Sequence, residues 1–121
     1  MQRIMLKAKI HRARVTDANL DYEGSITIDE ELMEAADILP FEQVQIYNLT
    51  NGNRFETYAL KGTRGSGLIC VNGAAAHKAT TDDLIIIASY GLLVEEEHTH
   101  HHPKLVYVDE ANRIVQVKSS D

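Results

Sequence analysis

Apolar and polar residues alternate along much of the chain with a period of two, which is typical of strands that bury one face. The first segment of this kind covers residues 6–10. Beyond His11 the apolar positions change phase to Ala13 and Val15, and this change predicts a bulge or a bend. Residues 84–88 are apolar without a break, which predicts a strand buried on both faces.

The same reasoning predicts further short strands at 25–28, 44–49, 54–60, 68–71, 105–108 and 114–117. The pair Asn51-Gly52 separates two of these strands and favours a hairpin, because both residues tolerate positive φ. Asp29 stands at an N-cap position, so we expect a short helix that ends before Pro40. Many short strands and one or two short helices predict a mainly β protein. We favour a small closed barrel, because an open sheet of this size leaves exposed edges.

Length and composition narrow the class of protein. A chain of 121 residues predicts one domain, 1–121, and 44% hydrophobic residues are typical of a globular protein. No apolar run approaches the ~18–20 residues of a membrane span, and no signal peptide is recognisable. The single cysteine, Cys70, excludes an internal disulfide framework. These features predict a cytoplasmic protein without a membrane partner.

Charge is unevenly distributed, although the formal net charge is only −6. Five basic residues and no acidic ones fall in the first fourteen positions: Arg3, Lys7, Lys9, Arg12 and Arg14. This basic segment could pair with the acidic body, hold a small anion or bind nucleic acid. We rank pairing with the body first and nucleic acid last, because affinity for a phosphate backbone comes from many cations acting together.

Two local features have simple structural explanations. Histidines 98, 100, 101 and 102 could capture a divalent metal, since neutral imidazoles are good ligands. However, they follow three glutamates in a segment, 95–103, that we expect to be a solvated polar loop, so we predict no metal site. Cys70 lies in an apolar run and is expected to be a small buried hydrophobe.

The pair Gly24-Ser25 has chemical interest, because a glycine leaves its carbonyl open to attack by the following hydroxyl. Alone, the pair indicates a turn into a strand. It occurs together with His11-Arg12, Tyr22-Glu-Gly-Ser25, Thr50-Asn-Gly52, Arg54-Phe-Glu-Thr-Tyr58, Arg64-Gly-Ser66, Val71-Asn-Gly-Ala-Ala-Ala-His77 and Ile85-Ile-Ile-Ala-Ser89. This set resembles the pyruvoyl-dependent aspartate 1-decarboxylase family over residues 1–92, and only weakly over 93–121.

The resemblance implies a double-psi β-barrel, usually a homotetramer with active sites shared between neighbouring subunits. It implies a proenzyme that cleaves itself between Gly24 and Ser25 into a β chain, 1–24, and an α chain, 25–121. Ser25 would become a pyruvoyl group, which forms a Schiff base with L-aspartate. Loss of CO₂ would then give β-alanine for pantothenate and coenzyme A synthesis. Neither a metal nor a dissociable cofactor is expected.

The resemblance also implies roles for other residues. Tyr58 would donate a proton to the product carbanion, and Thr57 would stabilise the oxyanion of self-cleavage and border the substrate. Arg54 suits a carboxylate because its guanidinium makes two parallel hydrogen bonds, and Lys9 is the best second cation for a dianion. The remaining pocket residues would be Asn72, Gly73, Ala74, Ala75, His11 and Tyr22.

One conflict and two alternatives follow from the residues. On an ideal strand Thr57 and Tyr58 point to opposite faces, so one pocket can hold both only through a bulge, a bend or a subunit boundary. The first alternative is a non-enzymatic β-barrel that binds an anionic ligand or assembles by its edges. The second is a metal-binding module at the histidine segment. The complete set of Gly24, Ser25, Lys9, Arg54, Thr57 and Tyr58 favours the enzyme.

Overall fold

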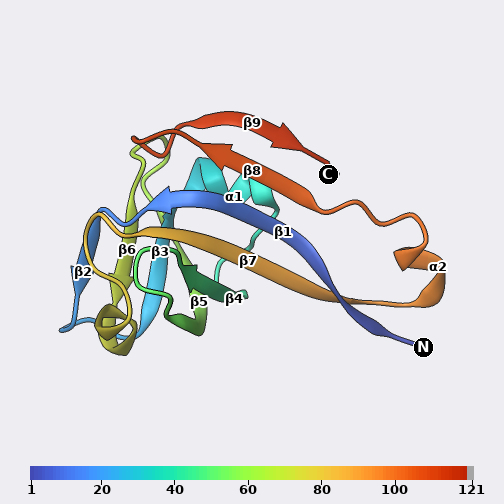
Figure 1. Ribbon diagram of the computed structural model, residues 1–121, viewed down its shortest axis with the longest axis horizontal. Helices are drawn as coiled ribbons and strands as arrows, with labels where there is room; N and C mark the ends of the chain where they lie inside the picture. Colours follow the sequence, from blue (N-terminus) through green and yellow to red (C-terminus); the bar gives the residue numbers. More distant parts are fainter. Residues whose placement is uncertain (120–121) are drawn as a thin grey trace.

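The structure is a computed structural model and describes residues 1–119. Within these residues nine strands form one sheet in the order β2-β6-β3-β5-β4-β7-β1-β8-β9 (Figure 1). The strands are β1 (Arg3–Arg14), β2 (Asp17–Asn19), β3 (Ser25–Asp29), β4 (Gln43–Asn48), β5 (Arg54–Gly62), β6 (Ile69–Asn72), β7 (Leu84–Leu93), β8 (Lys104–Val108) and β9 (Ile114–Lys118). The helices are α1 (Glu30–Ala36), α2 (Glu95–His98) and the 3₁₀ helix Gly73–His77.

The sheet curls so that strands far apart in its order come together. β1 lies between β7 and β8, and the chain that follows β1 donates a backbone hydrogen bond from Thr16 N to Ile69 O of β6, at 2.8 Å. β2 then continues along the same side of β6, the side opposite β3. The mainly β prediction is confirmed, and this arrangement is consistent with a small barrel.

The core occupies the inner face of the curled sheet. Its largest fully buried side chains include Ile10, Ile26, Ile28, Ile46, Ile69, Ile85, Ile87 and Val106. Burial of these side chains from water supplies the main drive for folding. Since successive residues of a strand point to opposite faces, their polar neighbours lie on the outer face of the sheet.

The predicted irregularity of β1 is confirmed. The pairing of β1 with β7 shifts between Ile10 and Ala13, where Arg12 adopts a φ of 62°. The extra residue returns Ala13 and Val15 to the buried face, which is why the apolar phase changes in the sequence.

The predicted helix and hairpin are also confirmed. Asp29 Oδ1 accepts a hydrogen bond from Glu31 N at 2.9 Å, which caps α1. The carboxylate is 2% exposed and also accepts from Gly65 N at 2.9 Å and Gly67 N at 2.7 Å. Burial opposes its ionisation, yet these amides hold the pKa of Asp29 below its ordinary value. β4 and β5 pair across a turn in which Gly52 has a φ of 79°.

One local expectation needs correction, and two elements were not expected. The segment 95–103 contains one helical turn, α2, in which Glu97 Oε1 accepts from Val94 N at 3.0 Å. The 3₁₀ helix Gly73–His77 was not predicted. β2 was not predicted, because Asp-Ala-Asn has no apolar alternation. No helix among residues 1–119 is long and apolar enough to cross a membrane.

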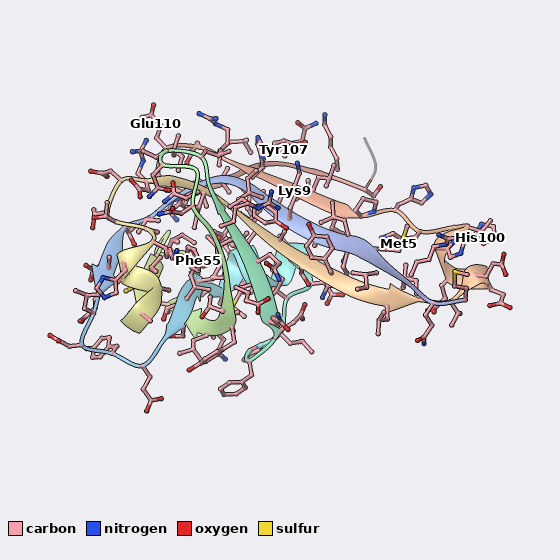
Figure 2. The ribbon with its side chains drawn as sticks, turned by 60° about the horizontal axis from the view of Figure 1, so that its bottom comes forward. Met5, Lys9, Phe55, His100, Tyr107 and Glu110 are labelled. Atoms are coloured by element: carbon pink, nitrogen blue, oxygen red, sulfur yellow. The ribbon has the colours of Figure 1, made fainter. Side chains whose placement is uncertain are left out.

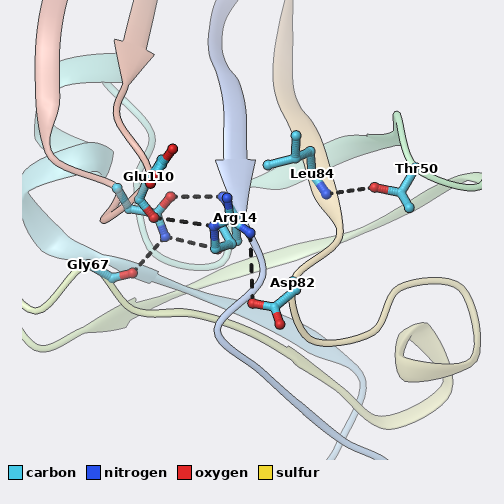
Figure 3. A network of polar contacts seen from close by, with 7 residues as sticks. Arg14, Thr50, Gly67, Asp82, Leu84 and Glu110 are labelled. Atoms are coloured by element: carbon cyan, nitrogen blue, oxygen red, sulfur yellow. Dashed lines mark hydrogen bonds and ion pairs between the residues drawn. The ribbon is translucent and has the colours of Figure 1, made fainter.

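Pairing of the basic segment with the acidic body is confirmed at two positions. Lys7 Nζ lies 2.8 Å from Glu42 Oε2, and Arg14 Nη1 lies 3.8 Å from Asp82 Oδ1. Arg14 Nε also donates to the Glu110 carbonyl at 3.3 Å (Figure 3). The buried Asn112 side chain donates to the carbonyls of Arg14 and Gly67 in the same network, at 2.9 and 2.8 Å.

Candidate active site

A pocket of about 470 Å³ opens on the outer face of β2, β6, β3 and β5. It is lined by Asp17, Tyr22, Glu23, Ser25, Thr27, Tyr58, Leu60, Leu68, Cys70 and Asn72. Strand register explains why these residues meet. Ser25 is opposite Asn72 and Thr27 is opposite Cys70 in the antiparallel β3–β6 pair, and such partners share a face.

Ser25 lies in this pocket and is 1% exposed. Its Oγ accepts a hydrogen bond from Asn72 Nδ2 at 3.1 Å and donates to the Glu23 carbonyl at 3.4 Å. The hydroxyl is therefore held beside the chain that precedes it, one residue from the Gly24 carbonyl. Two of the predicted site residues, Ser25 and Asn72, are in direct contact.

Gly24 is packed against Gly73. A Cβ on Gly73 would lie 2.5 Å from Gly24 N, 2.6 Å from Tyr22 O and 2.7 Å from Gly24 Cα. Gly73 also has a φ of 64°, which favours glycine. Ala74 N is the nearest atom to a Cβ built on Gly24, at 4.0 Å. The 72–74 backbone thus forms a close-fitting wall along residues 22–24.

Thr57 and Tyr58 do not point into the same space. The β4–β5 pairing is regular, with Gln43 opposite Tyr58 and the buried Val44 opposite Thr57. Tyr58 therefore lies on the outer face and lines the pocket with Ser25, whereas Thr57 lies on the inner face. A bulge was one possible way for Thr57 and Tyr58 to reach the same pocket. The β4–β5 pairing shows no bulge at these residues.

Lys9, His11 and Arg54 lie elsewhere, on the outer face of β1, β7, β4 and β5. Lys9 is opposite Ala88 of β7, and Ala88 is in turn opposite Gln45 of β4. Tyr47, two residues further along β4, is opposite Arg54 of β5. Figure 2 shows Lys9 on this part of the molecule. None of the three lines the pocket around Ser25.

The Arg54 guanidinium lies over the ring of Tyr47, 4.2 Å from its centroid. The Tyr47 hydroxyl is 2.7 Å from the Tyr90 hydroxyl, and this hydrogen bond, together with burial, raises the pKa of Tyr90. Among residues 1–119, no carboxylate forms an ion pair with Arg54 or Lys9. Both cations are thus available to an anion from outside this chain.

His11 is held against Tyr107 of β8, with ring centroids 5.5 Å apart in an edge-to-face arrangement. Its Nδ1 is buried and has no hydrogen-bond partner among the described residues. Burial, with the charges of Lys9 and Arg12, lowers the pKa of His11. The imidazole therefore favours its neutral form at this face.

The charges of the Ser25 pocket do not suit an anionic substrate by themselves. Asp17 and Glu23 are among the lining residues, and no lysine or arginine of the described chain is. Of the other predicted pocket residues, Tyr22 lines it with 64% exposure, and Ala75 packs against the core. A dicarboxylate would need cations from another source.

The histidine segment lies far from this pocket. α2 is at the end of the molecule opposite β2, β3 and β6, and Figure 2 labels His100 there. His101 Nε2 is 2.6 Å from the Leu6 carbonyl, which ties the segment to β1. Among residues 1–119, no three His, Cys, Asp or Glu side chains are grouped as metal ligands would be. The predicted lack of a catalytic metal stays a prediction.

Sequence reasoning missed several residues of the pocket, notably Thr27, Cys70 and Asp17. A signal was available for two of them. Positions i and i+2 of a strand share a face, so Ser25 predicts Thr27 and Asn72 predicts Cys70 once both strands are assigned. Tyr47 was missed because its role depends on a cross-strand neighbour, Arg54.

Known proteins are similar to this chain over nearly its whole length. The chain matches the aspartate decarboxylase family over residues 1–115. The chain belongs to this family. The match extends past residue 92, beyond which the motif resemblance is only weak, and includes the histidine segment.

Individual relatives are similar over nearly their full length. An aspartate 1-decarboxylase of Acetivibrio thermocellus is 61% identical over 117 residues, covering 97% of this chain and 93% of that protein. One of Syntrophobacter fumaroxidans is 62% identical over 113 residues, covering 93% and 91%. One of Shouchella clausii is 55% identical over 121 residues, covering 100% and 95%.

Proposed function

We propose that this protein decarboxylates L-aspartate to β-alanine and CO₂ in the cytoplasm, for pantothenate and coenzyme A synthesis. Its cofactor would be a pyruvoyl group made from Ser25. Family membership supports the reaction. The observation that carries the assignment to this site is the contact of Asn72 with a buried Ser25 that shares its pocket with Tyr58.

The proposed cleavage uses only this chain and water. Ser25 Oγ adds to the Gly24 carbonyl carbon, the C–N bond between Gly24 and Ser25 breaks, and an ester forms. Loss of the Ser25 α-proton and cleavage of its Cβ–Oγ bond then release the Gly24 carboxylate. The dehydroalanine left at position 25 takes up water and loses ammonia. The close packing of Gly73 against residues 22–24 supports the first step, because it holds the segment that carries the Gly24 carbonyl in place.

The residues around position 25 fit a pyruvoyl group. The pyruvoyl keto oxygen would be bonded to Cα of residue 25, in place of the Ser25 nitrogen, while Oγ leaves with Gly24. Asn72 Nδ2, which donates to Ser25 Oγ at 3.1 Å, supplies an N–H donor beside this position. When formed, the pyruvoyl group supplies an electron-accepting carbonyl for the substrate amine. Tyr58 is proposed to hold the proton that returns to the substrate carbon, since its side chain lines the same pocket.

We further propose that a neighbouring copy completes each site, within a homotetramer. The Ser25 pocket is lined by two carboxylates, whereas Lys9 and Arg54 lie on a separate outer face with no acidic partner among the described residues. Packing one copy's Lys9–Arg54 face against the next copy's pocket would supply the cations that a dicarboxylate needs.

The 24-residue segment is expected to stay bound after cleavage. Its β1 lies between β7 and β8, and its side chains Ala8, Ile10 and Val15 are fully buried. The ion pair between Lys7 and Glu42 adds to this attachment. The basic segment would then both retain the cleaved piece and present Lys9 to the substrate.

Intact mass spectrometry under denaturing conditions tests the cleavage. We expect two chains that break between Gly24 and Ser25, the longer one lacking a free N-terminal amine. Ser25→Ala should leave one chain and form no β-alanine. A Ser25→Ala variant that still makes β-alanine would rule out the pyruvoyl proposal.

Mixed oligomers test whether two copies share a site. Arg54→Gln keeps the Ser25 pocket but loses the Arg54 cation, and Ser25→Ala keeps the Arg54 face but loses the pyruvoyl precursor. Each variant alone should therefore be nearly inactive. If sites are shared, co-expression places intact halves together in about a quarter of them, because each half comes from either variant with equal chance in a closed assembly. Activity no greater than the sum of the two variants alone would show that one copy supplies both halves.

A further inference from the structure

The side-chain amide of Asn72 is held at three points. Its Nδ2 donates to Ser25 Oγ at 3.1 Å and to Thr27 Oγ1 at 3.2 Å, while its Oδ1 accepts from Cys70 Sγ at 3.1 Å. Asn72 is 5% exposed. Both amide hydrogens are therefore used, and the amide oxygen has a donor of its own.

The orientation of this amide determines what Ser25 experiences. As observed, an N–H group points at Ser25 Oγ. Rotation of the amide by half a turn would present Oδ1 instead, and Ser25 would have to donate its proton to Asn72. Only the observed orientation places a donor beside Ser25 Oγ, the atom that gains negative charge when its proton leaves and again when the Cβ–Oγ bond breaks.

Cys70 and Thr27 favour the observed orientation. Burial, and the negative charge of Asp17, raise the pKa of the Cys70 thiol, so it keeps the proton that it donates to Asn72 Oδ1. Thr27 Oγ1 accepts the second amide hydrogen. In the rotated form the amide N–H would face sulfur, which is a weak acceptor.

We propose that Cys70 and Thr27 are positioning residues for self-cleavage, which fix the Asn72 amide so that it donates to Ser25 Oγ. This inference rests on the proposed cleavage at Gly24-Ser25. It gives a role to Cys70, which the sequence alone suggests is only a small buried residue. It also explains why a hydroxyl stands at position 27, on the pocket side of β3.

The test follows cleavage of freshly produced full-length chain by intact mass spectrometry. Cys70→Ala and Cys70→Val remove the donor, and we expect each to slow cleavage by about tenfold or more, since loss of one donor to a developing charge costs ~10²–10³ in rate when the loss is complete. Cys70→Ser retains a donor and should cleave within about threefold of the parent rate. Thr27→Val should be slow and Thr27→Ser should recover.

Val71→Ala is the matched control, because Val71 lies on β6 between Cys70 and Asn72 but faces the core. It should lower the melting temperature without slowing cleavage as Cys70→Ala does. Cleavage of Cys70→Ala and Cys70→Val at the parent rate would overturn the inference alone. So would a Cys70→Ser variant that is folded yet as slow as Cys70→Ala. A parent chain that stays uncut while making β-alanine would overturn the proposed function, and the inference with it.

Discussion

Replacement of Gly73 by alanine tests the contact between the 72–74 wall and the cleavage segment. The new Cβ would lie 2.5–2.7 Å from three backbone atoms of Tyr22 and Gly24, none of which belongs to a flexible side chain. The φ of 64° adds a second penalty, because alanine rarely adopts this conformation. Either residues 22–24 move away or the strain remains in the folded state.

The two penalties can be added. A non-glycine residue in the left-handed region costs roughly 1–2 kcal/mol, and overpacking of a tight contact typically costs about 1–3 kcal/mol. Gly73→Ala should therefore lower the free energy of unfolding by about 2–5 kcal/mol. It should also slow cleavage strongly, because relief of the contact displaces the Gly24 carbonyl relative to Ser25.

Gly52→Ala is the matched control. Gly52 has a φ of 79° but nothing within 4 Å of its Cβ position, so it carries only the conformational penalty. Unfolding is best compared in the Ser25→Ala chain, which cannot cleave, and cleavage in the otherwise unchanged chain by intact mass spectrometry. Gly52→Ala should cleave at the parent rate. If Gly73→Ala also cleaves at the parent rate and is no less stable than Gly52→Ala, the wall does not hold the segment.

Three further predictions concern single side chains. Asp29→Ala should lower the free energy of unfolding at pH 7 by about 2–4 kcal/mol, because buried amides lose their acceptor. Because folding lowers the pKa of Asp29, the difference in free energy of unfolding between the parent and Asp29→Ala should shrink as the pH falls through the folded-state pKa. Denaturant titrations at pH 7 and pH 3 measure this difference. Tyr58→Phe should cleave itself normally but lose about 100-fold or more in turnover, measured as β-alanine formed. Equal losses in the rate of self-cleavage and in turnover would exclude the proton-donor role. Tyr47→Leu should raise KM for aspartate several-fold without slowing cleavage, since it removes the ring under Arg54; an unchanged KM would contradict this.

Local sequence patterns predicted most of the secondary structure. Period-two alternation located most strands, Asp29 marked the start of α1, and Asn51-Gly52 marked a hairpin. The parallel pairing of β3 with β5 could not be predicted in this way, because it joins segments whose contact depends on the whole barrel. β2 was not predicted because three residues, Asp-Ala-Asn, are too few to show an apolar period, although its pairing with β6 forms one side of the pocket.

Only some of the pocket residues could be predicted from local motifs, because the others depend on how the strands pair. The family resemblance placed Ser25 and Asn72 in one pocket, but it did not predict the side chains that hold the Asn72 amide. Thr27 and Cys70 face the pocket because β3 and β6 pair antiparallel in one particular register. A shift of that register by one residue would place Thr27 and Cys70 on opposite faces of the sheet. Register is a property of the folded sheet, which single motifs do not encode.

The segment from Arg54 to Tyr58 has the opposite relation between sequence and space. Its end residues, Arg54 and Tyr58, are close in sequence and share an outer face, yet they are separated by about 13 Å along β5 at the usual strand rise. Tyr58 lies toward Ser25 of β3, whereas the Arg54 guanidinium lies over Tyr47 of β4, on the other side of β5. One small dicarboxylate bound at Ser25 would not reach an Arg54 held in this position on the same chain. We therefore expect this short motif to serve two different active sites in the assembly: Tyr58 acts in its own pocket, and Arg54 acts in the pocket of a neighbouring copy.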